Sequence, residues 1–267
     1  MQLTDTHCHL DFPDFDEDRE ALLARCQASG VTEYIIPAIA ETNWHRVMAL
    51  ANQHPGVCYG LGVHPWYAGE QEEGAIDRLR ELVSSRPEGL VAIGECGLDL
   101  RSHVPQARQF ELFEAQIKLA VDVELPLIVH SVRANDTVAK LLRRFKPVRG
   151  GVIHAFSGSL QQAEAFWQLG FYLGVGGVIS YERANKTREV FRAMPLESLV
   201  LETDAPDMPL QGRQGERNTP EALPEIAAIL MGIRKESAEH VSTMLIDNAE
   251  RLFRHRKRQR NIGVTSG

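Results

Sequence analysis

The 267-residue sequence has no long hydrophobic run, few cysteines and no excess of basic charge. No stretch of about 18 uninterrupted apolar residues occurs, which excludes a membrane-spanning helix. The amino-terminal segment MQLTDTHCHLDF has neither a basic nor an apolar signal region, so no signal peptide is expected. The four cysteines form no CxxC pair and are expected to be reduced. These absences predict a cytoplasmic protein.

The charge balance is acidic, with 29 basic residues, 36 acidic residues and a formal net charge of −7. Nonspecific binding to nucleic acid needs many lysine and arginine contacts to phosphates, and this balance argues against such a surface. A local phosphate pocket is compatible with it. From about residue 254 the tail is expected to be a solvated, frayed end rather than a nucleic-acid arm. It holds the one basic cluster, Arg254, Arg256, Lys257, Arg258 and Arg260.

Short β-rich apolar runs alternate with helical patterns along the whole sequence. Eight runs predict strands: QLTDT, TEYIIPAI, VCYGLGV, GLVAIGE, LPLIVH, GGVIHAF, FYLGVGGVI and SLVLETD. Apolar residues at helical spacing lie between them, as in ALLARCQAS, QFELFEAQIKLAVDV and TVAKLLRRF. Eight strands, each followed by a helix, predict a single α/β domain over residues 1–267, a TIM (β/α)8 barrel. An open parallel sheet is the alternative.

No linker, composition break or further repeat divides the chain. Two more helices are expected after the eighth strand. The first is predicted to begin at Thr219-Pro220-Glu221, which offers a capping hydroxyl, a proline in the first turn and an early acid.

Histidines gather at the predicted carboxyl ends of the strands, where such barrels build their active sites. Five of the ten histidines fall there: His7, His9, His64, His130 and His154. The other five are placed on helices, loops or the tail and are expected to have structural roles: His45, His54, His103, His240 and His255.

The first of these ends carries His7-Cys8-His9. Because side chains alternate along a strand, His7 and His9 share one face and can bind one ion, whereas Cys8 points away and is expected to pack as a small apolar residue. Glu95 directly follows the apolar run LVAIG, where an ionised carboxylate is costly to bury without a cation. A carboxylate can bridge two ions, so Glu95 is the predicted centre of a two-metal cluster. Pairing of Glu95 with an arginine is the alternative.

Asp204 ends the eighth predicted strand, and Glu202 lies two residues earlier on the same face, where it could orient a ligand or a water. The joint pattern is a mixed nitrogen and oxygen ligand set, and it suits Zn²⁺, Mg²⁺, Mn²⁺ or a similar divalent ion better than a thiolate-held structural zinc. The predicted metal ligands are His7, His9, Glu95, His130, His154 and Asp204.

Three stretches resemble the TatD family of metal-dependent deoxyribonucleases, a branch of the amidohydrolase-like barrels. They are DTHCHLD at 5–11, PLIVHSVR at 126–133 followed by Asp136, and LETDAP at 201–206. The blocks GVHP (62–65), GECGLD (94–99), HAFSG (154–158) and RNTP (217–220) are also similar to family blocks. The likeness covers residues 1–253, and the segments VGGVISYERANKTREV and ETDAPDMPLQG look most like the YjjV-type branch of the family.

The resemblance implies two divalent metal cations. One ion would be held by His7, His9, Glu95 and Asp204, and the other by Glu95, His130 and His154. The resemblance also implies cleavage of phosphodiester bonds in DNA, in some members from an end. Leu100 stands where the family usually has an aromatic residue, and the YjjV-type branch is less clearly tied to DNA. The natural substrate is therefore open.

The expected reaction is two-metal hydrolysis of a phosphoester, in DNA or a nucleotide, by a water that the ions activate. Asp204 is the expected ligand and general base. Arg133, three residues past His130, is placed to bind phosphate through two N–H groups. His64 either contacts the phosphate or leaving group or packs against a helix.

Two other functions fit the same residues. An amidohydrolase-type enzyme would cleave C–N or C–O bonds on the same barrel, but many two-metal members carry a carbamylated lysine where this chain has Glu95, and Arg133 suits phosphate. A non-catalytic metal-binding protein is the third hypothesis, in which a proton-accepting Asp204 would have no purpose. A monomer with no membrane association is expected.

Overall fold

The structure is a computed structural model and describes residues 2–253. Eight strands form one sheet in sequence order, and each neighbouring pair from the first to the eighth is parallel. They are β1 (Leu3–Asp5), β2 (Val31–Pro37), β3 (Val57–Leu61), β4 (Leu90–Asp99), β5 (Leu127–Val132), β6 (Gly151–Ile153), β7 (Phe171–Val175) and β8 (Leu199–Leu201).

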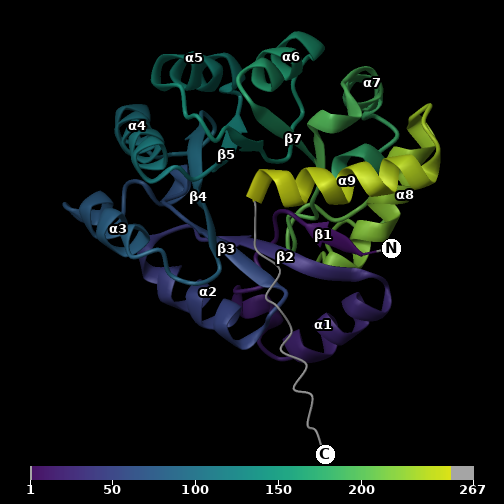
Figure 1. Ribbon diagram of the computed structural model, residues 1–267, viewed down its shortest axis with the longest axis horizontal. Coiled ribbons are helices and arrows are strands. Elements are labelled where there is room, and N and C mark those ends of the chain that lie inside the picture. Colours follow the sequence, from purple (N-terminus) through teal and green to yellow (C-terminus); the bar gives the residue numbers. More distant parts are fainter. Residues whose placement is uncertain (1, 254–267) are drawn as a thin grey trace, which may run out of the picture.

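Seven helices follow the strands of the same number and surround the sheet (Figure 1). They are α1 (Arg19–Ala28), α2 (Glu41–Gln53), α3 (Ala75–Ser84), α4 (Gln106–Val123), α5 (Asn135–Phe145), α6 (Leu160–Gln168) and α7 (Asn185–Ala193). The two predicted helices after β8 are α8 (Leu223–Ile233) and α9 (Ala238–Phe253). The structure therefore confirms the predicted (β/α)8 barrel and excludes the open sheet.

Hydrogen bonds between the segments that follow β8 and β1 close the barrel. Thr6 donates to the carbonyl of Leu201 through both its backbone N–H, at 2.9 Å, and its hydroxyl, at 2.8 Å. The buried Asp5 carboxylate accepts from the backbone N–H of Thr203 at 3.0 Å and from the Thr203 hydroxyl at 2.6 Å. Closure brings together the segments that follow β1 and β8, which carry the predicted ligands His7, His9 and Asp204.

A cluster of apolar side chains closes the amino-terminal end of the barrel interior. Along β5, Ile128 points into the interior while Leu127 and Val129 face the helices, as side-chain alternation requires. Figure 1 shows α9 lying across this end, and its last residues, Leu252 and Phe253, pack against the interior cluster. The strand residues of that cluster are Ile35, Val91, Ala92, Ile128, Val152 and Val200. The carboxyl ends of the strands are thus left as the end that can hold a site.

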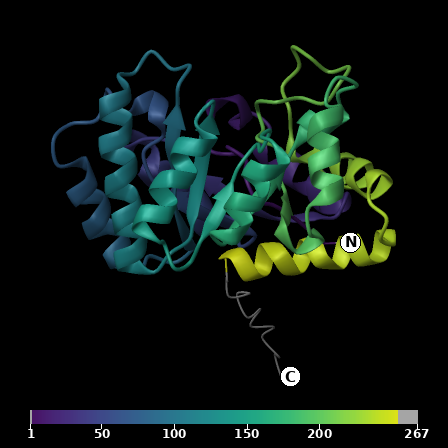
Figure 2. The ribbon, with the colours of Figure 1, turned by 90° about the horizontal axis from the view of Figure 1, so that it is seen from above.

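The loop that follows β8 rises on the face opposite to α9, as Figure 2 shows. Within this loop and its neighbours several non-glycine residues adopt positive φ angles, including Arg133 (φ 54°), Ala155 (φ 46°) and Asp204 (φ 58°). Each follows a barrel strand, and such uncommon backbone conformations gather at functional sites. The Gly94–Glu95 and Ala205–Pro206 peptide bonds are cis.

Several predicted boundaries were wrong. β1 ends at Asp5, so His7 and His9 lie beyond the strand, and alternation along a strand cannot be the reason that they face the same way. Glu95 and His130 lie inside β4 and β5 rather than at their ends, because both strands run further than their apolar stretches. β8 ends at Leu201, which leaves Asp204 in the following loop.

The start of α8 also differs from the prediction. Residues Pro220–Ala222 form a 3₁₀ turn before α8, and Thr219 makes no side-chain capping bond to the backbone. Its hydroxyl instead donates to the Glu221 carboxylate at 3.4 Å. The predicted basic tail and His255 lie outside the described residues. Among residues 2–253 no helix has both the length and the apolar character needed to cross a membrane.

Asn248 connects α9 to the start of β8. Its fully buried side-chain amide donates to the carbonyls of Leu196, at 2.9 Å, and Leu199, at 2.8 Å. We predict that Asn248→Ala lowers the free energy of unfolding by about 2–4 kcal/mol, because two buried carbonyls lose their donor and a cavity forms. Urea unfolding followed by circular dichroism measures this difference.

Asp247→Ala is the matched control for this prediction. The Asp247 side chain is 45% exposed, and its ion pair with Arg251 spans 3.9 Å. Such a pair contributes at most about 1 kcal/mol. Equal unfolding free energies for the two variants would show that the Asn248 bonds do not hold α9 in place.

Candidate metal centre

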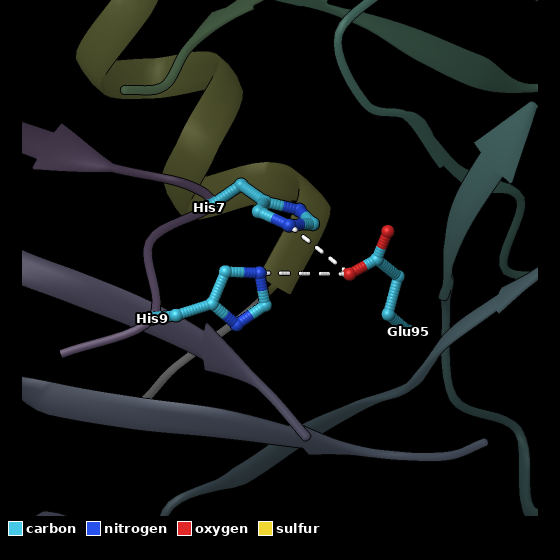
Figure 3. A group of neighbouring side chains, drawn as sticks. All are labelled: His7, His9 and Glu95. Atoms are coloured by element: carbon cyan, nitrogen blue, oxygen red, sulfur yellow. Dashed lines mark ion pairs between the residues drawn. The ribbon is translucent and has the colours of Figure 1, made fainter. Parts of the chain in front are cut away.

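The two oxygens of Glu95 face two different groups of histidines. Figure 3 shows the first group, in which His7 and His9 both point their Nε2 atoms at Glu95 Oε2, at 3.3 and 3.7 Å. The two imidazole planes are 82° apart, so the rings approach the carboxylate from different directions. Asp204 Oδ1 completes this group, at 3.5 Å from His7 Nε2 and 3.8 Å from His9 Nε2.

The second group surrounds the other oxygen of the same carboxylate. Glu95 Oε1 lies 3.1 Å from His130 Nδ1 and 3.0 Å from His154 Nε2. These two ring nitrogens are 3.1 Å from each other. The structure therefore brings all six predicted ligands together, with Glu95 between the two groups.

His130 is oriented by a carboxylate behind it. Its Nε2 lies 3.2 Å from Asp99 Oδ2, and Asp99 is almost fully buried. A hydrogen bond from Nε2–H to Asp99 leaves the lone pair of Nδ1 free, directed at Glu95 and His154. We did not assign Asp99 a role from the sequence. The family-like block GECGLD contains it, but nothing in the sequence pairs it with His130.

Asp5 supports the first group in a similar way. It is fully buried, and beyond its bonds to Thr203 it accepts the backbone N–H of His7 at 3.3 Å. Burial raises its pKa to about 7, against the lowering effect of these bonds. Asp5 thus ties His7 to the segment that carries Asp204. Asp5 stands within the family-like block DTHCHLD at 5–11, but nothing in the sequence pairs it with Thr203.

Glu202 lies near Nδ1 of His154, whereas Glu95 lies near Nε2 of the same ring. Its Oε1 accepts the backbone N–H of Ala155 and lies 3.8 Å from His154 Nδ1. Gly174 in β7 makes room for it, because a Cβ at Gly174 would stand 2.2 Å from Glu202 Oε2. Gly174 lies inside β7, and its lack of a side chain accommodates this carboxylate.

His64 is nearly buried, and its Nε2 lies 3.6 Å from Glu95 Oε1. Its Nδ1 accepts the backbone N–H of Trp66 at 3.1 Å. In the neutral ring the proton is then on Nε2, so His64 presents an N–H to the centre. Contact of His64 with the phosphate or leaving group stays a prediction, and the N–H faces the centre as that contact requires.

Burial and mutual charge set the protonation of the cluster. Burial lowers the pKa of His7 and of His64 to about 3. Burial opposes ionisation of Glu95, but His154 and His7 hold its pKa well below the usual range. Burial also opposes a proton on His154, but Glu95 raises that pKa to about 10. The His7 and His154 rings stack with their centroids 3.9 Å apart, so a proton on His154 disfavours a proton on His7. A cation bound here would compete with the proton on His154.

The donor set fits divalent cations. Both ring nitrogens of His7 are buried and have no hydrogen-bond partner, although Nε2 faces two carboxylates. A buried polar atom in a folded protein rarely lacks a hydrogen-bond or metal partner. Within residues 2–253 every ion pair of Glu95 is with a histidine, which removes the alternative of pairing with an arginine. Three overlapping groups are compact enough for an ion: His7, His9 and Glu95; His7, His154 and Glu202; His64, Glu95 and His130.

The residues expected to lie outside the site do so. Cys8 is fully buried in the core, and all four cysteines are free. His45 and His240 lie on helices, His103 lies in the loop after β4, and His54 pairs with Glu20 at 3.2 Å. Arg133 is exposed, and no hydrogen bond or ion pair engages its guanidinium among the described residues. It is therefore free to bind a ligand.

Comparison with known proteins agrees with the predicted resemblance. The family described as TatD related DNase matches residues 4–254. A protein of Escherichia coli K12, described as the uncharacterized metal-dependent hydrolase YjjV, is 47% identical over 250 residues, which cover 93% of this chain and 96% of that protein. The 3′-5′ ssDNA/RNA exonuclease TatD of Pantoea sp. strain At-9b is 36% identical over 249 residues, which cover 90% of this chain and 95% of that protein.

Solved structures extend the likeness to three dimensions. The crystal structure of E. coli YjjV, a TatD homologue, matches with a TM-score of 0.92 at 46% identity, over 94% of this chain and 98% of that one. A TatD family hydrolase of Entamoeba histolytica shares the fold, with a TM-score of 0.85 at 21% identity, over 95% and 98% of the two chains. The family match spans nearly the whole chain, and both solved structures are described as TatD homologues or TatD family members. This protein belongs to the TatD family of metal-dependent hydrolases.

Proposed function

We propose that this protein hydrolyses phosphoester bonds with two divalent cations and that its substrate is DNA or a nucleotide. The observation that carries the proposal is the Glu95 carboxylate, whose two oxygens face two separate groups of imidazoles. Such a carboxylate can bridge two ions. The relatives named TatD are described as exonucleases of single-stranded DNA and RNA, which supports a phosphodiester substrate.

The ligands of the two ions follow from the two groups. His7, His9 and Asp204 would hold the first ion with Glu95 Oε2, and His130 and His154 would hold the second with Glu95 Oε1. Bound divalent ions polarise phosphoryl oxygens and lower the pKa of water. Nitrogen and oxygen donors suit Zn²⁺, Mn²⁺ or Mg²⁺.

The remaining roles belong to the side chains at the edge of the centre. Asp204 accepts the proton of the attacking water, since its side chain is 16% exposed and stands beside both histidines of the first group. Arg133 binds the phosphate with its planar pair of donors. His64 donates its Nε2–H to the phosphate or to the leaving group, and Glu202 orients His154 from behind.

Chelation and metal replacement test the proposed function. We predict that chelation abolishes hydrolysis of bis-(p-nitrophenyl) phosphate and of a short oligodeoxynucleotide, and that Zn²⁺, Mn²⁺ or Mg²⁺ restores it. The circular dichroism spectrum should stay that of the folded barrel, because the core is built by apolar burial and not by the ions. Elemental analysis should find two ions per chain. Hydrolysis of p-nitroanilides in place of phosphoesters would contradict the proposal.

Asp204→Asn tests the general base. We predict a fall in kcat of about 10²-fold or more, the usual scale for a lost acid or base group. Asparagine has nearly the same shape and can still bind a cation through its carbonyl oxygen, but it cannot take up the proton. Steady-state kinetics and metal content are measured together. Asp207→Asn, three residues along the same loop, is the control and should keep wild-type kcat. Near-full activity of Asp204→Asn with both ions bound would make Glu202 the next candidate.

Arg133→Lys tests the phosphate contact. Lysine keeps the positive charge but loses the planar pair of donors, so we predict a higher KM for phosphoesters with unchanged metal content. Arg143→Lys is the matched control, since Arg143 is exposed in the last turn of α5. Wild-type kinetics for Arg133→Lys would remove the phosphate role assigned to this residue.

A further inference from the structure

Trp66 leaves its indole ring in solvent beside the metal centre. It is 53% exposed and lies in the 3₁₀ turn Pro65–Tyr67 shortly after β3. Its ring centroid is 5.8 Å from that of His64, and the rings of His64 and His130 are 4.4 Å apart. An exposed aromatic face therefore lies one side chain away from the proposed ligands.

A hydrogen bond holds this exposed ring in one orientation. The indole Nε1 donates to Asp99 Oδ2 at 2.7 Å, and Asp99 is only 2% exposed. The same oxygen receives His130 Nε2 at 3.2 Å. An exposed indole can donate to water, so a bond to a buried carboxylate is not needed to satisfy its N–H. The consequence of the bond is a ring whose face is preset relative to the metal centre.

We propose that Trp66 is the stacking surface for the base of a nucleotide whose phosphate is bound at the metal centre. This inference rests on the proposed function, since the phosphate site places the base. Every nucleobase has a π face, so stacking tolerates any sequence. The net charge of −7 leaves little scope for a broad basic surface, and base stacking supplies affinity without one.

A second aromatic ring on the same face of the barrel provides the comparison. A cavity of about 490 Å³ lies between the loops after β7 and β8, and Tyr181, Arg183 and Met208 contribute to its lining. The Arg183 guanidinium already lies over the Tyr181 ring, 5.1 Å from its centroid, and the Tyr181 hydroxyl donates to the carbonyl of Pro209 at 2.7 Å. Tyr181 thus has less free face than Trp66.

Binding of two ligands that differ only in the base tests the proposal. Isothermal titration of the protein with its metals compares thymidine 5′-monophosphate with 2-deoxyribose 5-phosphate. We expect the nucleotide to bind about tenfold more tightly than the sugar phosphate, the scale of one stacked base. Trp66→Leu should reduce this ratio to below about twofold. Trp66→Phe, which keeps an aromatic face but loses the bond to Asp99, should retain most of it, and Tyr181→Leu should leave it unchanged.

Both ligands carry a phosphate, so a general loss of phosphate binding through a disturbed Asp99 or His130 weakens both equally. The ratio of their two affinities is then unchanged. An unchanged ratio in Trp66→Leu, a ratio lost in Tyr181→Leu, or equal binding of the two ligands by the wild type would each overturn the proposal. Failure of either ligand to bind would overturn it as well. The proposed function is decided separately by hydrolysis, so a protein that prefers the nucleotide through Trp66 but cleaves no phosphoester would refute only the reaction.

Discussion

The structure depends on one buried negative charge. Glu95 is 2% exposed, and within the described residues only histidines lie at ion-pair distance from it. An ionised carboxylate in such surroundings is costly unless positive charge compensates it. A proton on His154, whose pKa Glu95 raises to about 10, supplies such charge, and the proposed divalent cations would supply it in place of that proton. In the proposed function these cations would lie on both sides of the carboxylate, one toward each group of histidines.

Buried carboxylates stand behind three of the proposed histidine ligands. Asp99 holds His130, Asp5 holds the backbone of His7, and Glu202 stands behind His154. These three carboxylates are buried, and the hydrogen bond between His130 Nε2 and Asp99 leaves Nδ1 of that ring free to bind a cation. His64 differs, because its inward nitrogen carries the proton. The position of the ring proton thus distinguishes His64, which is suited to donate a hydrogen bond to a substrate, from the proposed metal ligands.

The two ends of the barrel interior differ in polarity. At one end α9 seals the interior, where its Leu252 and Phe253 pack against the interior cluster. At the other end polar groups replace apolar ones, several backbone angles are unusual, and Trp66 stays in solvent. Burial at the sealed end can offset the cost of gathering charged groups at the open one. This division allows loops to change without loss of the fold.

The sequence by itself determined the alternation of strands and helices, the barrel and the six residues proposed to bind metal. These follow from apolar periodicity and from the rule that parallel strands end at one face, together with the family-like blocks. Only the tertiary structure decided which nitrogen of each histidine faces inward and that Asp99, Asp5 and Trp66 belong to the site. It also showed that His7 and His9 converge beyond β1 and not along it. Such features depend on contacts between residues far apart in the chain, where local periodicity carries no information.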